Sequence, residues 1–286
     1  MSTSTARARS PIDTLHAAMQ RSGSVACVGL DPVLERLPSS IPQADPTEAI
    51  RAFCLGVVES VAETVAAVKV QSACFERYGV AGVAVMQEVI QAASLRGTTV
   101  VLDAKRGDIG ISAGHYAVSA GTTGADWVTV NGYLGMDGVE PFLEQCGAFV
   151  LVRTSNPGSA AFQDEQLEDG RTVAELMADQ VAAMAADRLG PSGWSDVGAV
   201  VGATHPEQAH QLRARLTGVT LLVPGIGAQG GTLEDCRPLV GPDGRGALLT
   251  ASRSVIYAQG DGDWKEAVAD AAQRLADETG TMAGLR

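Results

Sequence analysis

Short runs of apolar, largely β-branched residues recur along the whole chain, and polar or glycine-containing stretches separate them. Runs of this length predict buried strands. Eight strands are expected, at residues 24–30, 66–71, 98–103, 127–131, 148–154, 197–202, 220–224 and 247–251. The apolar pattern therefore predicts a protein built on eight short core strands.

Helical patterns fill the intervals between these strands. Apolar residues follow helix-like spacing over residues 46–64, 80–96, 172–189 and 206–216. Pro46 and Pro206 suit first helical turns, and Gly97 and Gly190 suit helix ends. The alternation predicts a parallel sheet with right-handed crossovers, and eight strands favour a closed (β/α)8 TIM barrel over an open doubly wound sheet.

The chain shows no linker or change of composition that would separate a second domain. Residues 1–286 are therefore expected to form one (β/α)8 barrel domain. The longest departure from regular alternation is an insertion at about residues 155–196, between strands five and six. It contains an acidic run at residues 164–169, which we expect to be a solvated loop.

Polar side chains at the carboxyl ends of the strands are the first candidates for chemistry, because active sites of such barrels lie there. The candidates are Asp31, Lys69, Gln71, Asp103, Lys105, Asn131, Thr154, Ser155, Thr204 and Arg253. The segments after strands seven and eight, residues 224–231 and 251–254, suit a phosphate group. Their glycines let backbone N–H groups approach an anion, and Arg253 adds a charged, bidentate donor.

The third strand ends in the most informative run, Val-Val-Leu-Asp103-Ala-Lys105-Arg-Gly-Asp108-Ile-Gly. Asp103 and Lys105 are two residues apart, so a pleated strand would point them to the same face. Asp108 follows directly after a glycine that permits a turn. Charges crowded at the end of a buried strand need partners, and on these residues alone they fit a structural ion-pair network as well as a catalytic cluster.

Composition narrows the range of partners. The chain has 21 Lys and Arg against 33 Asp and Glu, a formal net charge of −12, which argues against nucleic acid or an anionic membrane. A small anionic ligand is compatible with this charge, since a local basic pocket outweighs distant, screened charges. Five scattered cysteines without a Cys-x-x-Cys pair, four dispersed histidines and no apolar signal or membrane segment predict reduced thiols, no metal site and a cytoplasmic protein.

These motifs, taken in order, resemble those of the orotidine 5′-phosphate decarboxylases, and most closely those of the longer bacterial (type 2) branch. The run from Asp103 to Ile109 resembles the family's Asp-x-Lys-x-x-Asp-Ile signature, and Cys-Val-Gly-Leu-Asp31-Pro resembles its first-strand motif. Lys69 matches the second-strand lysine. Thr-Ser155-Asn-Pro-Gly, residues 224–231 and Arg253 match the later segments, so the resemblance covers most of the chain.

The resemblance implies a role for each matched residue. Asp31 and Lys69 would bind the ribose, Lys69 also joining the charged cluster. Ser155 would contact the pyrimidine, and Pro224, Gln229 and Arg253 would form the phosphate site. Ile109 and Ser112 are further expected substrate-binding residues, although Ile111-Ser112 stands where Asn-Thr is usual, and Ser252 stands where glycine usually precedes the arginine.

The implied activity is decarboxylation of orotidine 5′-phosphate to UMP in pyrimidine biosynthesis, without a metal or organic cofactor. Lys105 would stabilise and protonate a carbanion at C6 of the pyrimidine, while Asp103 and Asp108 hold and aim its ammonium group. The resemblance also implies a homodimer in which Asp108 enters the site from the neighbouring subunit.

Two other functions are compatible with the barrel and its motifs. Magnesium-dependent decarboxylases of sugar-acid phosphates share Asp-x-Lys-x-x-Asp, but they need a glutamate ligand near the second strand, where this chain has Lys69 and Gln71, with Glu76 further on. A catalytically silent barrel that binds nucleotides is the other alternative. The joint presence of Asp103, Lys105 and Asp108 argues against a silent barrel.

Overall fold

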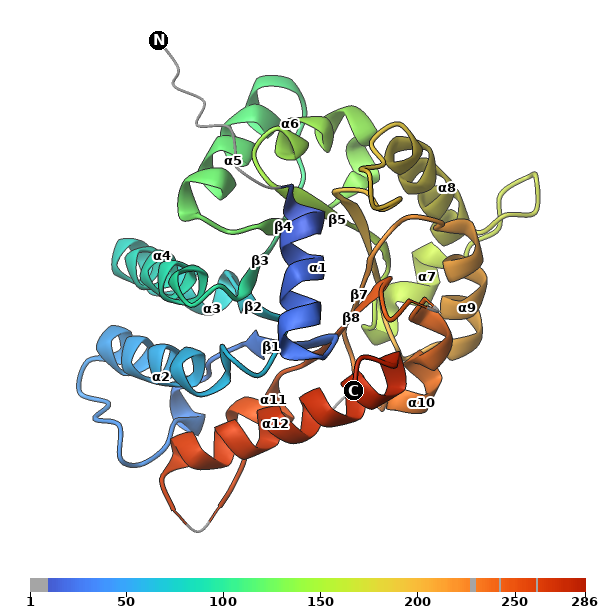
Figure 1. Cartoon of the computed structure of the whole chain (residues 1–286). Coiled ribbons are helices and arrows are strands. Elements are labelled where there is room, and N and C mark those ends of the chain that lie inside the picture. Colours follow the sequence, from blue (N-terminus) through green and yellow to red (C-terminus); the bar gives the residue numbers. More distant parts are fainter. Residues whose placement is uncertain (1–9, 227–229, 242, 261) are drawn as a thin grey trace.

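Eight parallel strands close into a barrel in the order of the chain (Figure 1). The structure is a computed structural model that describes residues 10–226, 230–241, 243–260 and 262–286. The strands are β1 (Ala26–Leu30), β2 (Ala67–Gln71), β3 (Thr99–Arg106), β4 (Trp127–Val130), β5 (Gly147–Arg153), β6 (Val197–Val201), β7 (Leu221–Val223) and β8 (Ala247–Ala251). Pairing of β1 with β8 closes the sheet, so the predicted (β/α)8 barrel is confirmed.

Helices surround the barrel on its outer face (Figure 1). The longer ones are α1 (Pro11–Ser22), α2 (Pro46–Val61), α4 (Gly79–Leu95), α5 (Gly110–Thr123), α8 (Val173–Ala186), α9 (Pro206–Arg215) and α12 (Trp264–Ala283). Short helices are α3 (Ala73–Glu76), α6 (Glu140–Leu143), α7 (Ala160–Gln163), α10 (Leu233–Cys236) and α11 (Arg253–Ile256). Single 3-10 turns lie at Leu34–Arg36, Gly132–Leu134, Met136–Gly138, Pro157–Ser159 and Arg237–Leu239.

Local sequence explains where the predicted helices begin and end. Asp45 caps α2 by accepting hydrogen bonds from the Thr47 and Glu48 N–H groups, and Pro46 occupies the first turn. A reciprocal capping box between Thr172 and Glu175 begins α8. All four predicted helices are present, each within three residues of its predicted ends.

The third strand departs most from its prediction. We expected it to end at Asp103, but β3 continues to Arg106. Its pairing with β4 shifts register between Leu102 and Arg106, and Lys105 within this bulge has φ +46°. The bulge bends the strand at the residues that carry the charged motif, which is a common use of bulges beside active sites.

Helix α1, for which the sequence analysis made no prediction, packs at the amino-terminal mouth of the barrel. It buries Ile12, Leu15 and Met19, and the Ile12 N–H donates to Asp196 just before β6 begins. The opposite mouth, at the carboxyl ends of the strands, is left open. None of the helices in the described ranges is both long and apolar enough to cross a membrane.

Candidate active site

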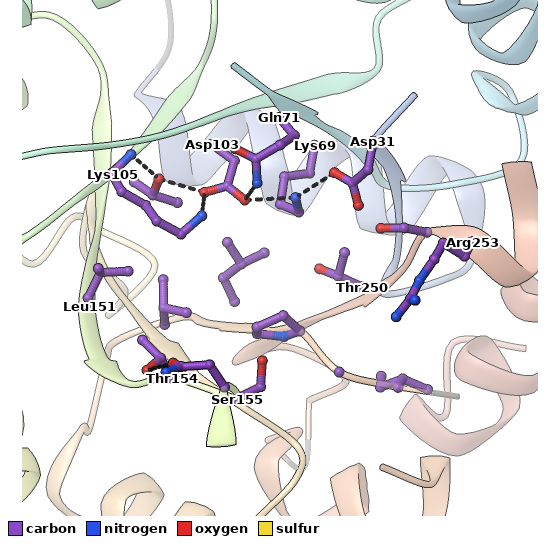
Figure 2. Close-up of a pocket in the computed structure, with 18 of the residues that line it drawn as sticks. Asp31, Lys69, Gln71, Asp103, Lys105, Leu151, Thr154, Ser155, Thr250 and Arg253 are labelled. Carbon is purple, nitrogen blue, oxygen red and sulfur yellow. Dashed lines mark hydrogen bonds and ion pairs between the residues drawn. The ribbon is translucent and has the colours of Figure 1, made fainter. Parts of the chain in front are cut away.

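A cavity of about 520 Å³ opens at the carboxyl ends of the strands (Figure 2). Every strand contributes to the lining, through residues in the strand itself, in the segment that follows it, or in both. The predicted site residues that line the cavity are Asp31, Lys69, Gln71, Asp103, Lys105, Thr154, Ser155, Pro224 and Arg253, whereas Asn131 and Thr204 do not line it. The site therefore lies where the barrel topology predicts it.

Four charged side chains form an alternating row along one wall of the cavity (Figure 2). The Lys69 ammonium lies 2.8 Å from Asp103 Oδ2 and 3.4 Å from Asp31 Oδ1. The Lys105 ammonium lies 2.6 Å from Asp103 Oδ1. Asp103 thus joins the two lysines, and the row runs Asp31, Lys69, Asp103, Lys105.

Burial and charge act in opposite directions on the two inner members of the row. Burial by itself lowers the pKa of Lys69, but the Asp31 and Asp103 carboxylates outweigh it and raise that pKa above its usual range. Burial by itself raises the pKa of Asp103, but Lys69 and Lys105 outweigh it and hold that pKa well below its usual range. Both groups are therefore charged at neutral pH, and the charges are fixed before a ligand arrives.

Lys105 is the member of the row that faces the cavity most openly. Its side chain is 47% exposed, whereas those of Lys69 and Asp103 are buried. Within the described ranges Asp103 is its one ion-pair partner. An ammonium group with one anchored partner and an open face is placed to act on a bound ligand.

The opposite wall carries Thr154 and Ser155, across the cavity from the charged row (Figure 2). They directly follow Arg153, the last residue of β5, whose side chain is 1% exposed. The Arg153 guanidinium donates to the Thr154 carbonyl (2.9 Å) and the Ser159 hydroxyl, and pairs with the Asp164 carboxylate at 3.1 Å. A buried arginine therefore ties the start of the insertion to the barrel.

The acidic run at 164–169 is exposed at Glu165, Glu168 and Asp169, as expected of a solvated loop, and Asp164 alone among its acidic residues is half-buried. Asp164 binds Arg153, and Asp169 pairs with Arg171 at 2.6 Å. Gln163 lies beside Arg153 and Asp164 and lines the cavity. Its side chain accepts from the Thr154 N–H (2.9 Å) and donates to Thr154 Oγ1 (2.9 Å), which fixes the backbone next to Ser155.

The end of the cavity beyond Asp31, away from Lys105, carries Arg253 (Figure 2). Arg253 follows β8 by two residues, and Pro224, Gly225 and Ile226 after β7 line the same cavity. Gly225 has φ +101°, a conformation that favours glycine. The expected phosphate amide, Gln229, lies outside the residues that the structure describes.

Ser252, the departure from the family's usual glycine, is accommodated by a glycine on the neighbouring strand. A Cβ atom added to Gly29 would lie 1.9 Å from Ser252 Oγ. The missing side chain at Gly29 therefore provides the space that the serine hydroxyl occupies.

Asp108, Ile109 and Ser112 do not line the cavity of the chain as described. Asp108 Oδ1 accepts from the Ile109 N–H at 2.8 Å, the Ile109 side chain is 57% exposed, and Ser112 is exposed on α5. Asp108 therefore makes no ion pair with Lys105 of its own chain in the described ranges, and its expected place in the neighbouring subunit's site stays a prediction. The turn after β3 carries this carboxylate away from the ammonium group.

Comparison with known proteins agrees with this geometry. The model of the orotidine 5′-phosphate decarboxylase / HUMPS family matches residues 25–268. The chain belongs to this family. Orotidine 5′-phosphate decarboxylase from Rhodopirellula baltica is 40% identical over 283 residues, covering 89% of this chain and 93% of the relative. The enzyme of the same name from Roseiflexus sp. strain RS-1 is 42% identical, covering 93% of this chain and 95% of the relative.

Solved structures extend the agreement to the fold. The structure of Leishmania donovani OMP decarboxylase superposes with a TM-score of 0.80 at 34% sequence identity, covering 96% of this chain and all of that one (100%). The two chains therefore share the barrel fold over nearly their whole lengths. The resemblance read from the motifs is confirmed.

Several residues of the site were missing from the predicted set. Thr129, Leu151, Gln163 and Thr250 line the cavity. Thr129 and Thr250 could have been predicted from the sequence, because each is a polar residue near the end of an otherwise apolar strand. Leu151 and Gln163 could not, because an apolar strand residue and a loop glutamine are ordinary without knowledge of what they face.

Proposed function

We propose that this chain catalyses the decarboxylation of orotidine 5′-phosphate to UMP. The observation that carries the proposal is the Lys105 ammonium, half exposed to the cavity and held 2.6 Å from a buried carboxylate, in a member of this family. The reaction leaves an electron pair on a ring carbon, and a fixed cation beside that carbon is what it requires.

Lys105 has two roles in the proposed reaction. The bond between C6 and the carboxylate breaks, CO2 leaves, and its bonding electron pair remains on C6, where the ring delocalises it poorly. The ammonium group stabilises this carbanion by its charge and then transfers a proton to C6, which completes UMP. Solvent returns the proton to the lysine.

Asp103 keeps the ammonium in place without rearrangement during the reaction. Two lysines and buried surroundings hold its carboxylate charged, as the lowered pKa indicates. The same charge lies close to where the substrate carboxylate must sit, so it also disfavours the bound ground state. Both effects require Asp103 to be fixed, and the row of ion pairs fixes it.

The layout of the cavity matches the order of groups along the substrate. Arg253 at one end suits the phosphate, Asp31 and Lys69 in the middle suit the ribose hydroxyls, and Lys105 and Ser155 face each other across the remaining space (Figure 2). The pyrimidine would lie between these last two residues. Phosphate contacts far from C6 supply binding free energy that holds the ring in register with Lys105.

We further propose that the working unit is a dimer in which Asp108 of one subunit completes the site of the other. Asp108 lies outside the cavity of its own chain, on a rim that exposes large apolar side chains. The exposed members are Ile109, Ile111, Tyr133, Leu134 and Phe162. A second copy covering this rim would bury them and bring Asp108, Ile109 and Ser112 to the partner's cavity.

The magnesium-dependent alternative lacks its ligand. Glu76, the glutamate that follows β2, pairs with Arg106 at 2.5 Å and lines a separate cavity with α4 and α5 residues. Lys69 stands at the second strand, where the metal-binding glutamate would be needed, and its ammonium lies between Asp31 and Asp103. A cation there favours a substrate with negative charge and no metal ion beside it.

The loss of pyrimidine absorbance, followed with purified protein, orotidine 5′-phosphate and EDTA, tests the proposal. We expect conversion to UMP that EDTA does not slow. Binding of UMP without conversion would instead support the silent barrel. Neither binding nor conversion, with turnover of 3-keto-gulonate 6-phosphate on adding magnesium, would support the sugar-acid alternative.

A further inference from the structure

We propose that Thr129 is a positioning residue that sets Lys105 relative to Asp103, an inference that rests on the proposed function. Thr129 lies on β4 and is 1% exposed. Its hydroxyl oxygen accepts from the Lys105 backbone N–H at 2.9 Å, and the hydroxyl donates to Asp103 Oδ1 at 2.9 Å. One buried hydroxyl therefore joins the backbone of the lysine to the carboxylate that holds its ammonium.

These contacts close a small ring of interactions. Asp103 Oδ1, which accepts from the Thr129 hydroxyl, also binds the Lys105 ammonium at 2.6 Å (Figure 2). The Thr129 oxygen accepts from the Lys105 N–H, so the hydroxyl hydrogen points away from that N–H and toward the Asp103 carboxylate. One carboxylate oxygen, Asp103 Oδ1, thus holds Lys105 at both ends: it binds the ammonium directly and the backbone N–H through the Thr129 hydroxyl.

The backbone of Lys105 needs such a restraint. Among the described residues it is the one non-glycine with positive φ, at +46°. This left-handed conformation is unfavourable for a residue with a side chain and persists only where the surroundings impose it. It turns the Lys105 side chain back over Asp103 instead of along the strand.

The strand pairing does not supply the restraint. Register between β3 and β4 shifts between Leu102 and Arg106, and regular bonding resumes where the Asn131 N–H donates to the Arg106 carbonyl at 2.7 Å. Lys105 lies in the gap, and a side chain from β4 accepts its N–H in place of a backbone carbonyl. Thr129 thereby stabilises the bulge that aims the lysine.

Other threonines of the barrel show that a buried hydroxyl does not by itself indicate this role. Thr99 and Thr220 have buried hydroxyl oxygens with no hydrogen-bond partner among the residues that the structure describes. Thr99 is the first residue of β3 and Thr220 directly precedes β7, and neither lines the cavity. They provide controls for the same substitution at buried barrel threonines outside the site.

The test compares Thr129→Val, which keeps the shape and removes the hydroxyl, with Thr129→Ser, which keeps the hydroxyl. We expect Thr129→Val to lower kcat roughly 10- to 100-fold through misplacement of Lys105. KM for orotidine 5′-phosphate and the UMP dissociation constant should stay within about twofold, since Thr129 holds groups that act on C6. Thr129→Ser should recover most of kcat, and Thr220→Val should match wild type.

Two results would overturn the role of Thr129. One is a Thr129→Val enzyme whose kcat stays within about twofold of wild type. The other is a loss of kcat in Thr129→Val that is matched by the same loss in UMP affinity or is not recovered in Thr129→Ser, since general disruption would produce either. Absence of turnover by the wild type, measured in the same series, would instead overturn the proposed function.

Discussion

Asp103 accepts hydrogen bonds from four side chains, those of Lys69, Gln71, Lys105 and Thr129. The sequence predicted the lysines, because their spacing and family motif are visible in the chain. It did not predict Thr129 as a site residue, because its importance depends on a bulge in the neighbouring strand. The residues alone also could not show that Asp108 lies outside the cavity of its own chain, since the turn after β3 sets its direction.

Gly29 offers a test at this scale of how the site tolerates Ser252. Gly29→Ala would bring its Cβ within 1.9 Å of Ser252 Oγ and 3.3 Å of Asp31 Oδ2. We expect the overpacked variant to lose about 1–3 kcal/mol of unfolding free energy, measured by urea denaturation. Adding Ser252→Gly should restore most of the loss, and a double variant as unstable as Gly29→Ala would contradict the account.

At the scale of elements, the strand and helix positions follow from apolar spacing, and the errors concentrate where tertiary partners decide. An arginine at the end of β5 gives no sign in the sequence that it will be buried. Its partners, Asp164 and Gln208, lie 11 and 55 residues further on. The insertion's first segment is thus ordered by contacts that no local pattern contains.

Weakening this anchor should affect one part of the substrate. Asp164→Asn removes the charge that pairs with Arg153, which should loosen residues 154–164 opposite the charged row. We expect KM for orotidine 5′-phosphate to rise roughly threefold to tenfold, in line with loss of a hydrogen-bonded ion pair. Inhibition by ribose 5-phosphate, which has no pyrimidine, should not change.

Asp169→Asn is the matched control for this prediction. Asp169 belongs to the same acidic run but is itself exposed and pairs with the half-buried Arg171. The Asp169→Asn variant should leave KM for orotidine 5′-phosphate and the inhibition constant of ribose 5-phosphate unaltered. If Asp164→Asn weakened inhibition by ribose 5-phosphate as much as it raised KM for orotidine 5′-phosphate, residues 154–164 would not act on the pyrimidine.

At the scale of the whole molecule, the closed barrel was predictable and the packing of its two mouths was not. The apolar pattern did not predict that α1 would cover the amino-terminal mouth, because the apolar face of this helix is short. That residues 1–286 form a single domain stays a prediction. The apolar rim around Asp108 is spread over the segments that follow β3, β4 and β5, so it becomes one surface only once the barrel closes.

His16 on α1 should make the stability of the molecule depend on pH. Its ring packs edge-on against Trp194 at 5.8 Å, and both nitrogens are buried with no partner among the described residues. Burial, aided by Arg245, lowers the pKa of His16 to about 4 from 6.5. The unfolded chain therefore takes up the proton first as pH falls.

Stability should accordingly decrease between about pH 6.5 and pH 4, by up to roughly 3 kcal/mol from this residue. His16→Phe keeps the ring and removes the titration, so urea denaturation at pH 7.5 and pH 5 should show a smaller difference than in wild type. His115→Gln, on the exposed face of α5, serves as control. An unchanged pH difference in His16→Phe would contradict the prediction.

Mixing two inactive variants tests the shared site. If Asp108 serves the neighbouring subunit, a heterodimer of Lys105→Ala with Asp108→Ala contains one site with neither change and one with both. An equal mixture that exchanges subunits freely should regain up to about a quarter of wild-type activity. Each variant alone should stay inactive, and a mixture no more active than its components would count against sharing.

The central claim is that Lys105 performs the chemistry while other residues bind the nucleotide. The most direct test measures decarboxylation of orotidine 5′-phosphate by the Lys105→Ala variant alongside its affinity for UMP, with wild type as reference. We expect turnover to be abolished and UMP still to bind, because Arg253, Asp31 and Ser155 are untouched. Turnover within about tenfold of wild type would contradict it, since a group that stabilises and protonates the carbanion cannot be removed at so small a loss.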